Sequence, residues 1–357
     1  MTTVTTVRVD SDSVLREAAE ALAGAGRIAL DTEFMRVDTY YPKLCLLQLC
    51  MPGRVFCIDP LAVPDCAPLA PLLAAPGQPK LMHAARQDLE ALQVHGGLGV
   101  APVIDTQVAA ALLGLPEQAG YAWLVEHCCG VVLDKTQTRT DWAQRPLSEA
   151  QWEYAAQDVL WLEPVLEVLL QRLDALGRRT WLEEECARLG PDEAAPPWQR
   201  LKGLAQWQGQ DLAVAQALAE WREALAQRAN RPRAWLLRDE TLYALAKQRP
   251  ATLNELSRLP SMAPGTVRRY GPELLELVKV AARERAPEAV DSGRLDADQL
   301  AVVARLSARV KACASALGLA PTMLASRRDL ERLACGQPVA RLTRGWRREV
   351  LGELAGA

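Results

Sequence analysis

Apolar and polar positions alternate in short stretches through the first quarter of the chain. Glycine and proline separate these stretches, which is typical of strands joined by turns. The pattern predicts three consecutive strands, a helical stretch at 65–73 and a fourth short strand. The four predicted strands cover 27–34, 43–50, 55–59 and 80–83.

Helical periodicity replaces this alternation further along the chain. Apolar residues recur at helical spacing over 86–94, 106–113, 121–129 and 148–176. Consecutive strands followed by strands that alternate with helices predict an α/β domain built on a mixed sheet with flanking helices. We expect this domain to occupy residues 1–195.

The second half of the chain has only helical patterns. A proline-rich linker at 191–197 precedes them, and an apolar stripe from Leu212 to Leu225 predicts a long amphipathic helix. We expect a helical domain at 205–285, a polar stretch at 284–298 and a further helical domain at 292–357. Short sequence echoes near Arg238 and Arg328, and again near Arg269 and Arg344, suggest that the last domain is a degenerate repeat of the previous one.

Charge divides the chain in the same place. Residues 1–195 carry 15 basic and 27 acidic side chains, a net charge of −12, whereas residues 196–357 carry 26 and 17, a net charge of +9. A basic half joined to an acidic half favours a polyanion such as nucleic acid as the partner. Two domains that merely differ in surface charge would explain the asymmetry equally simply.

Composition and short motifs exclude several other classes of protein. The nine cysteines form no Cys-x-x-Cys pair, which favours reduced cysteines in a cytoplasmic protein. No apolar run is long enough for a membrane span, and no leader segment is evident. The glycine-rich segments lack the spacing of a nucleotide-binding loop, so we expect no nucleotide cofactor.

Two carboxylates end the first predicted strand. Because strand side chains alternate, Asp31 and Glu33 project from the same face, beside a run apolar enough to be buried. Two crowded carboxylates stay ionised only when a cation lies between them. The alternative is a strand end that emerges into solvent, where acidic residues are common.

Further acids follow in order along the chain. Asp88 lies in the first turn of a predicted helix, where a capping role is the simpler explanation, and Tyr154 and Asp158 share one helical face. Hard divalent ions such as Mg²⁺ or Mn²⁺ take oxygen ligands, and a two-ion site gathers carboxylates from separate elements. In phosphodiester hydrolysis two such ions, about 4 Å apart, activate water and stabilise the leaving oxygen.

These acidic motifs resemble those of the DEDD exonucleases with a ribonuclease H-like fold, and within them the ribonuclease D family. Asp31-Thr-Glu-Phe34, His83-Ala-Ala-Arg-Gln-Asp88-Leu and Tyr154-Ala-Ala-Gln-Asp158 match the three exonuclease motifs. The similarity extends through 39–48, 104–107 and 134–142, and the region at 211–280 resembles the helical HRDC module that follows the nuclease in this family.

The resemblance implies a role for each acidic residue. Asp31, Glu33, Asp88 and Asp158 would hold two divalent ions, and Tyr154 would orient the attacking water. Related enzymes with a histidine base carry it five residues before the last aspartate, but Glu153 stands there in this chain. Since a phenol with a pKa near 10 is a poor base at neutral pH, we expect Tyr154 to position a water that the ions have acidified.

Substrate contacts are predicted at residues beside these motifs. Lys135 and Arg139 suit phosphate and Trp142 suits a base, although a solvated loop anchored by Trp142 would look the same. Phe34 is a candidate to support the terminal base. His83 could line the cleft or be an ordinary core histidine.

The resemblance therefore implies a 3′→5′ exoribonuclease that releases nucleoside 5′-monophosphates, and it points to precursors of tRNA and other small structured RNAs as substrates. Five arginines around 222–238, close to Trp235, are suited to RNA, although a charged helix face explains each of them singly. Two alternatives stay open. One is a DNA-directed exonuclease of the same superfamily, and the other is a catalytically silent RNA-binding adaptor.

Overall fold

A computed structural model describes residues 4–190, 196–204, 207–283 and 295–352. The chain divides into two compact units. The first comprises Met1–Met35, Pro42–Pro191 and Leu295–Ala357, and the second comprises Arg36–Tyr41 and Asp192–Arg294. Most of the predicted linker at 191–197 and most of the predicted polar stretch at 284–298 lie outside the described residues.

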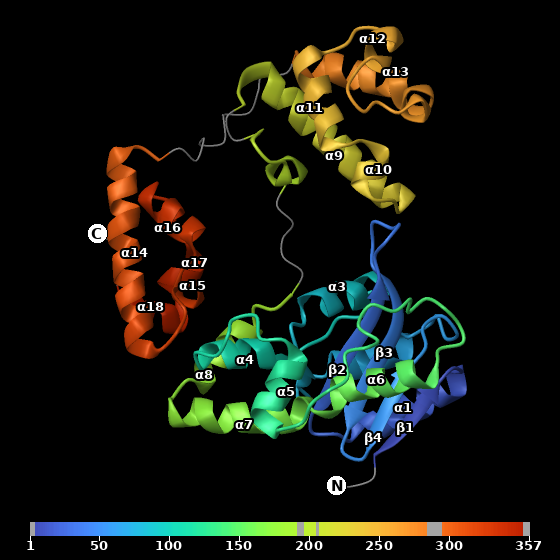
Figure 1. Ribbon diagram of the computed structural model, residues 1–357, viewed down its shortest axis with the longest axis vertical. Helices are drawn as coiled ribbons and strands as arrows, with labels where there is room; N and C mark the ends of the chain where they lie inside the picture. Colours follow the sequence, from blue (N-terminus) through green and yellow to red (C-terminus); the bar gives the residue numbers. More distant parts are fainter. Residues whose placement is uncertain (1–3, 191–195, 205–206, 284–294, 353–357) are drawn as a thin grey trace. The chain divides into compact units, whose positions relative to one another are not determined.

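A six-stranded mixed sheet forms the centre of the first unit (Figure 1). The strand order is β1-β4-β3-β2-β5-β6, with β3 antiparallel to both of its neighbours and the other pairs parallel. The strands are β1 (Thr5–Val9), β2 (Ile28–Met35), β3 (Lys43–Met51), β4 (Arg54–Ile58), β5 (Lys80–Met82) and β6 (Val103–Asp105). The predicted mixed sheet with flanking helices is confirmed.

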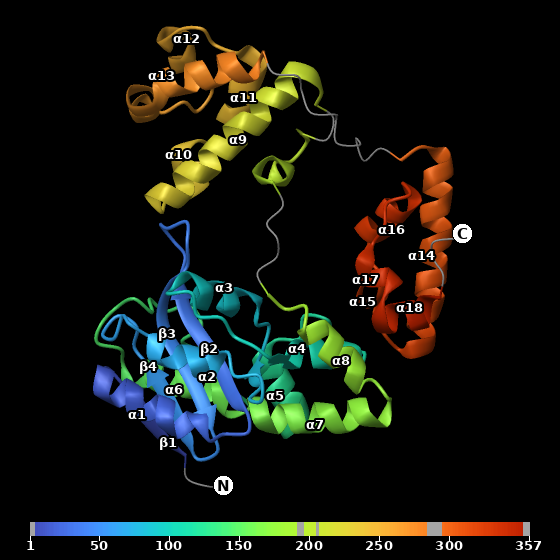
Figure 2. The ribbon, with the colours of Figure 1, turned by 180° about the vertical axis from the view of Figure 1, so that it is seen from behind.

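Helices cover both faces of this sheet (Figures 1 and 2). One face packs against α6 and α7, and the other packs against α1 and α3. Before the C-terminal segment, the helices of this unit are η1 (Ala67–Leu69), α1 (Asp12–Ala23), α2 (Ala70–Leu73), α3 (Arg86–Val94), α4 (Thr106–Leu112), α5 (Tyr121–Cys129), α6 (Glu149–Leu160), α7 (Leu162–Ala175) and α8 (Arg179–Cys186).

The predicted helix at 148–176 is two helices. Ser148 and Gln151 form a capping box at the start of α6, and the backbone N–H of Gln151 bonds to the Ser148 hydroxyl. The helix ends at Leu160, and α7 begins at Leu162 with Pro164 in its first turn, where a proline is tolerated. The break gives α6 its own direction across the sheet, which places Tyr154 and Asp158.

The pairing of β2 with β3 is irregular at one point. Asp31 lies opposite Gln48 and Glu33 lies opposite Leu46, but the register shifts between Glu33 and Phe34. Up to that shift, side chains of β2 alternate strictly between the faces. Ile28 and Leu30 pack in the α1 and α3 core, whereas Ala29 packs in the α6 and α7 core, the face that also carries Asp31 and Glu33.

The C-terminal helices belong to the first unit, although we predicted a separate domain at 292–357. They are α14 (Ala297–Leu317), α15 (Pro321–Leu324), α16 (Arg327–Ala334), α17 (Ala340–Thr343) and α18 (Gly345–Leu351). Arg347 forms a buried ion pair with Glu185, and the Trp346 ring stacks on Trp181 at 4.5 Å between centroids. Helices α8 and α18 therefore share one apolar core with the nuclease helices.

The second unit is helical in its described part, as predicted for 205–285. It contains η2 (Pro197–Arg200), α9 (Gly209–Ala229), α10 (Arg233–Leu236), α11 (Asp239–Gln248), α12 (Leu253–Ser257) and α13 (Pro264–Ala281). Helices α9, α10 and α11 have 21, 4 and 10 residues. Helices α14, α15 and α16 repeat this order of lengths with 21, 4 and 8 residues. This order is what a degenerate repeat predicts, and the common origin of the two segments stays a prediction.

Candidate active site

Three carboxylates meet on the sheet face beneath α6. Asp31 and Glu33 come from β2, and Asp158 comes from α6. One oxygen of each lies within 4.8 Å of the others. The alternation of β2 and the packing of α6 on β2, β3 and β4 create this arrangement. A set of converging carboxylate oxygens fits a hard divalent cation such as Mg²⁺ or Mn²⁺.

The fourth predicted acid, Asp88, lies outside that group of three. It is buried in the first turn of α3, and its Oδ1 accepts a hydrogen bond of 2.5 Å from the Thr32 hydroxyl. Thr32 lies between Asp31 and Glu33 on β2, so its side chain points to the opposite face of the strand. Asp88 still interacts electrostatically with Asp31 and Glu33, which places its charge near theirs.

Burial and mutual repulsion make these acids hard to ionise together. Burial raises the pKa of Glu33 to about 9, with Asp158 and Asp88 adding to the effect. Burial likewise raises the pKa of Asp158 to about 7 and that of Asp88 to about 6, against opposing hydrogen bonds from Tyr154 and Thr32. The pKa of Asp31 lies well above its ordinary value because of burial and then the charges of Asp88, Asp158 and Glu33. A bound cation would favour the ionised carboxylates and so lower these pKa values.

Tyr154 lies one turn before Asp158 on the same face of α6. Its hydroxyl lies 3.4 Å from the Thr138 hydroxyl, which belongs to the loop before α6. Burial, then the charge of Asp158, raises the pKa of Tyr154 well above its usual range. The phenol therefore stays protonated at physiological pH and can donate a hydrogen bond.

The turn before Asp88 is held by Asp105, a residue that sequence reasoning did not select. The Asp105 carboxylate accepts hydrogen bonds from the backbone N–H groups of Ala84 and Ala85 at 3.1 and 2.9 Å, and it also caps α4. Ala84 has a φ of +56°, a conformation that a residue with a Cβ rarely adopts. Asp105 thus stabilises a strained turn that leads into α3 and Asp88.

His83 has partners on both ring nitrogens, which favours the core-histidine alternative, and its substrate role stays a prediction. Its Nδ1 lies 2.9 Å from the Thr106 hydroxyl and its Nε2 lies 2.9 Å from the Ala119 carbonyl. Both ring nitrogens are therefore engaged, and burial lowers the pKa of the ring. This contact pattern matches the alternative of a core histidine.

Trp142 is not the exposed base platform that we considered. Its side chain is only 3% exposed and packs in the α6 and α7 core, with its ring centroid 6.0 Å from that of Tyr154. The Trp142 carbonyl accepts a hydrogen bond from Arg145, whose guanidinium pairs with Asp59 at 2.6 Å. The residue anchors its loop, as the alternative predicted.

Three further residues were predicted to contact the substrate, namely Lys135, Arg139 and Phe34. Lys135 and Arg139 are exposed in the loop that carries Thr138. Phe34 is partly buried against the α1 and α3 core and is the first residue of β2 after the register shift. The substrate roles of Lys135, Arg139 and Phe34 stay predictions.

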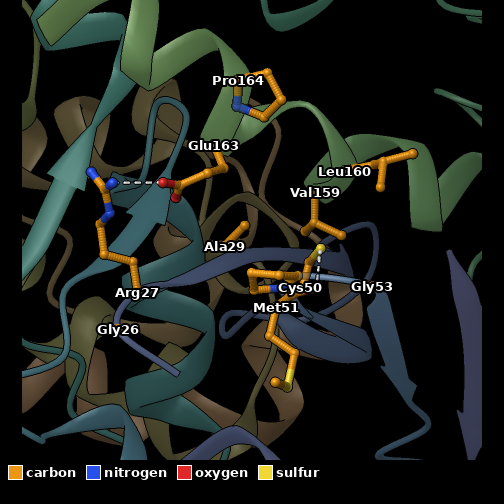
Figure 3. Close-up of a pocket in the computed structure, with 11 residues that line it drawn as sticks. Gly26, Arg27, Ala29, Cys50, Met51, Gly53, Val159, Leu160, Glu163 and Pro164 are labelled. Atoms are coloured by element: carbon orange, nitrogen blue, oxygen red, sulfur yellow. Dashed lines mark hydrogen bonds and ion pairs between the residues drawn. The ribbon is translucent and has the colours of Figure 1, made fainter. Parts of the chain in front are cut away.

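A separate pocket of about 510 Å³ opens on the same sheet face (Figure 3). Ala29, Cys50 and Val159 line it, so it neighbours Asp31 and Asp158 along the chain. The Glu163 carboxylate faces Arg27 at 2.7 Å across its rim. Because most of the lining is apolar and Glu163 is already paired, this pocket lacks the oxygen ligands of the carboxylate group.

No helix in the described part of the chain is long and apolar enough to cross a bilayer. All nine cysteines are free thiols. The expectation of reduced cysteines therefore agrees with the structure.

Comparison with known proteins gives consistent matches. Residues 6–174 match the family model for 3′–5′ exonucleases, and residues 211–278 match that for the HRDC domain. The chain is 38% identical to a ribonuclease D of Acidiphilium cryptum, over 97% of this chain and 91% of that protein. It is 40% identical to a ribonuclease D of Pseudomonas paraeruginosa, over 91% of this chain and 90% of that protein. The crystal structure of RNase D from Escherichia coli matches with a TM-score of 0.91 and 32% identity, over 98% of each chain.

Proposed function

The chain belongs to the ribonuclease D family and is a 3′→5′ exoribonuclease, and from this premise we propose that it shortens structured RNAs with the help of two divalent ions. The observation that supports the proposal most directly is the convergence of Asp31, Glu33 and Asp158, with Asp88 close enough to interact electrostatically. Two Mg²⁺ or Mn²⁺ ions bound there would supply Lewis-acid activation of water and stabilisation of the leaving 3′ oxygen.

The protein's own residues have separate tasks in this proposal. Asp31, Glu33, Asp88 and Asp158 hold the ions, and Thr32 and Asp105 fix the position of Asp88. Tyr154 donates its phenolic hydrogen to the attacking water and so orients it toward the phosphate. Burial of the carboxylates limits access of bulk water, which strengthens each electrostatic interaction.

The proposed substrate is RNA with a structured body and a free 3′ end, such as a tRNA precursor. The Escherichia coli relative is described as an exoribonuclease involved in structured RNA processing. Arg231 and Trp235 of the HRDC domain support RNA binding, since the guanidinium lies 5.8 Å from the ring centroid and Trp235 is 60% exposed. Arg222 and Arg233 of the same cluster are paired with Asp239 and Glu223. We place this activity in the cytoplasm, where such precursors occur.

One assay separates this proposal from its alternatives. The purified protein is incubated with a 3′-extended tRNA precursor and with matched RNA and DNA oligonucleotides, with Mg²⁺, with Mn²⁺ or with a chelator. We expect stepwise loss of 3′ nucleotides from RNA, release of nucleoside 5′-monophosphates and complete dependence on the ions. Faster degradation of DNA would favour a DNA-directed enzyme, and intact RNA that stays bound would favour a silent adaptor.

A matched variant tests the carboxylates themselves. Asp31→Asn keeps the size of the side chain but removes the charge that an ion requires. We expect hydrolysis to fall below detection while RNA binding in the absence of ions is retained. Equal loss of both properties would contradict this division between catalysis and binding.

A further inference from the structure

The side-chain amide of Gln48 in β3 is buried and has no hydrogen-bond partner within the described part of the chain. Its side chain is 0% exposed, and neither Oε1 nor Nε2 makes a hydrogen bond to any described residue. Buried side-chain amides are nearly always hydrogen-bonded, because losing water without compensation is costly. An apolar side chain of similar volume would avoid that cost, so the amide requires a partner in another state of the protein.

The register of the sheet identifies the neighbours of this amide. Gln48 is paired with Asp31 across the β2–β3 ladder and with Cys57 across the β3–β4 ladder. Directly opposed residues of antiparallel strands project to the same face, with about 5 Å between their Cβ atoms. Gln48 and Asp31 therefore lie side by side on the face that α6 covers, within reach of one glutamine side chain.

The other neighbours of the Gln48 amide are poor hydrogen-bond partners. Of the buried residues of α6, Ala155, Ala156 and Val159 have no polar side-chain atoms. The fourth, Gln151, already has its amide hydrogen-bonded to Ser148 and Thr140. The thiol of Cys57 is a weak hydrogen-bonding group. Among the directly paired residues, only the carboxylate of Asp31 is a strong acceptor for the Nε2 hydrogens.

We propose that Gln48 is a positioning residue for Asp31, and that its side-chain amide donates a hydrogen bond to the Asp31 carboxylate when a divalent ion is bound. The inference rests on the proposed function. A carboxylate that binds an ion through one oxygen keeps lone pairs that need donors, and such outer hydrogen bonds fix the orientation of the ligand. Gln48 would hold Asp31 toward the ion and would gain the partner that it otherwise lacks.

Gln48→Met tests this with a side chain of similar length and no amide. Loss of an outer hydrogen bond to a metal ligand weakens ion binding by about 10- to 100-fold. We therefore expect Mn²⁺, titrated calorimetrically in the absence of RNA, to bind the variant about 10- to 100-fold more weakly than the wild type. The midpoint of thermal unfolding without ions should stay the same or rise, because the variant buries no unpaired amide.

Activity provides a second readout that a packing defect would not produce. We expect exonuclease activity of Gln48→Met to be low at limiting Mn²⁺ and to recover as Mn²⁺ is raised about 10- to 100-fold. Leu46→Met is the matched control, since Leu46 is the next residue of β3 on this face and lies opposite Glu33. It changes an apolar side chain in the same layer and should leave Mn²⁺ affinity unchanged.

Three outcomes would overturn the inference. Wild-type affinity for Mn²⁺ in Gln48→Met, with normal binding by the wild type, would show that the amide does not support Asp31. Absence of Mn²⁺ binding by the wild-type protein would remove the proposed function as well. A variant that binds Mn²⁺ weakly but stays inactive at any Mn²⁺ concentration would point to damaged packing and would also overturn the inference.

Discussion

The hydroxyl of Thr32 donates a hydrogen bond of 2.5 Å to the carboxylate of Asp88. The two residues are 56 positions apart in the sequence, and the bond joins the strand that carries Asp31 and Glu33 to the helix that carries the next acid of the site. Thr32 therefore contributes to the site although its side chain faces away from the other carboxylates.

Thr32→Val should loosen Asp88 and shift the pH dependence of activity. The Thr32 hydrogen bond lowers the pKa of Asp88, which burial raises to about 6. Without this bond the pKa rises further, so a higher pH is needed to ionise Asp88. We expect the acidic limb of the pH–rate profile to move upward and the free energy of unfolding to fall by about 1–2 kcal/mol. Thr32→Ser keeps the hydroxyl and should resemble the wild type in both measurements.

The ion-free protein should lose stability as pH rises from 5 to 9. The folded-state pKa values of Asp88, Asp158 and Glu33 are raised to about 6, about 7 and about 9, above their unfolded values near 4. The folded protein therefore holds more protons than the unfolded chain in this range, so the free energy of unfolding decreases with increasing pH. Thermal unfolding in chelator across this range measures the effect.

Divalent ions should reverse that trend. Ion binding requires deprotonated carboxylates, so the affinity for Mn²⁺ should increase over the same pH range. The stabilisation by Mn²⁺ should consequently be larger at pH 8 than at pH 6. An Mn²⁺ affinity that is independent of pH would show that these carboxylates are not the ligands.

Tyr154→Phe should lower kcat when Mn²⁺ is saturating. The pKa of Tyr154 lies above its usual range because of burial and then the charge of Asp158, so the phenol acts as a hydrogen-bond donor and not as a base. We expect kcat to fall by about 100-fold at every pH between 6 and 9, the scale for losing one well-placed polar group. Thr138→Val, which removes the hydroxyl at 3.4 Å, should have a much smaller effect. A change confined to the basic limb of the pH profile would instead indicate a titrating phenol.

Lys135 and Arg139 can be tested by the salt dependence of RNA binding. Each phosphate contact with single-stranded nucleic acid contributes about 0.7 to the slope of log affinity against log salt concentration. The double variant Lys135→Ala, Arg139→Ala should therefore bind RNA more weakly and reduce that slope by about 1.4. Arg16→Ala on α1, which is also exposed, serves as a charge-matched control for one position. An unchanged slope would remove both residues from the RNA path.

Local patterns predicted β2 and α6, which carry Asp31, Glu33 and Asp158, because the apolar residues of each element recur with a clear period. The alternation in β2 places Asp31 and Glu33 on one face, and the helical spacing places Tyr154 beside Asp158. Strands β1 and β6 and helix α1 were missed, although all three exist. Most of β1 is exposed or half-exposed at the sheet edge, so its sequence lacks the apolar face on which such predictions depend.

Long-range pairing accounts for what sequence patterns could not predict. Trp142 is buried in a loop whose Arg145 pairs with Asp59, 86 positions away. Likewise, the C-terminal helices join the first unit through Arg347 and Glu185, which are 162 positions apart. Lys80 begins β5, where a lysine is expected to reach solvent, yet it is 0% exposed. The periodicity of a single helix or strand cannot predict contacts between residues so far apart in the sequence.

The register shift after Glu33 gives the β2–β3 hairpin two mechanically distinct parts. Before the shift, Asp31 and Glu33 are held in regular pairing with Gln48 and Leu46. Inserting one residue there would turn Asp31 to the wrong face of the sheet. After the shift, from Phe34 to the turn of the hairpin, an added residue can be accommodated because the ladder is already irregular there. Natural or engineered changes in the length of the hairpin tip should therefore accumulate without cost to ion binding, whereas the inner ladder should tolerate none.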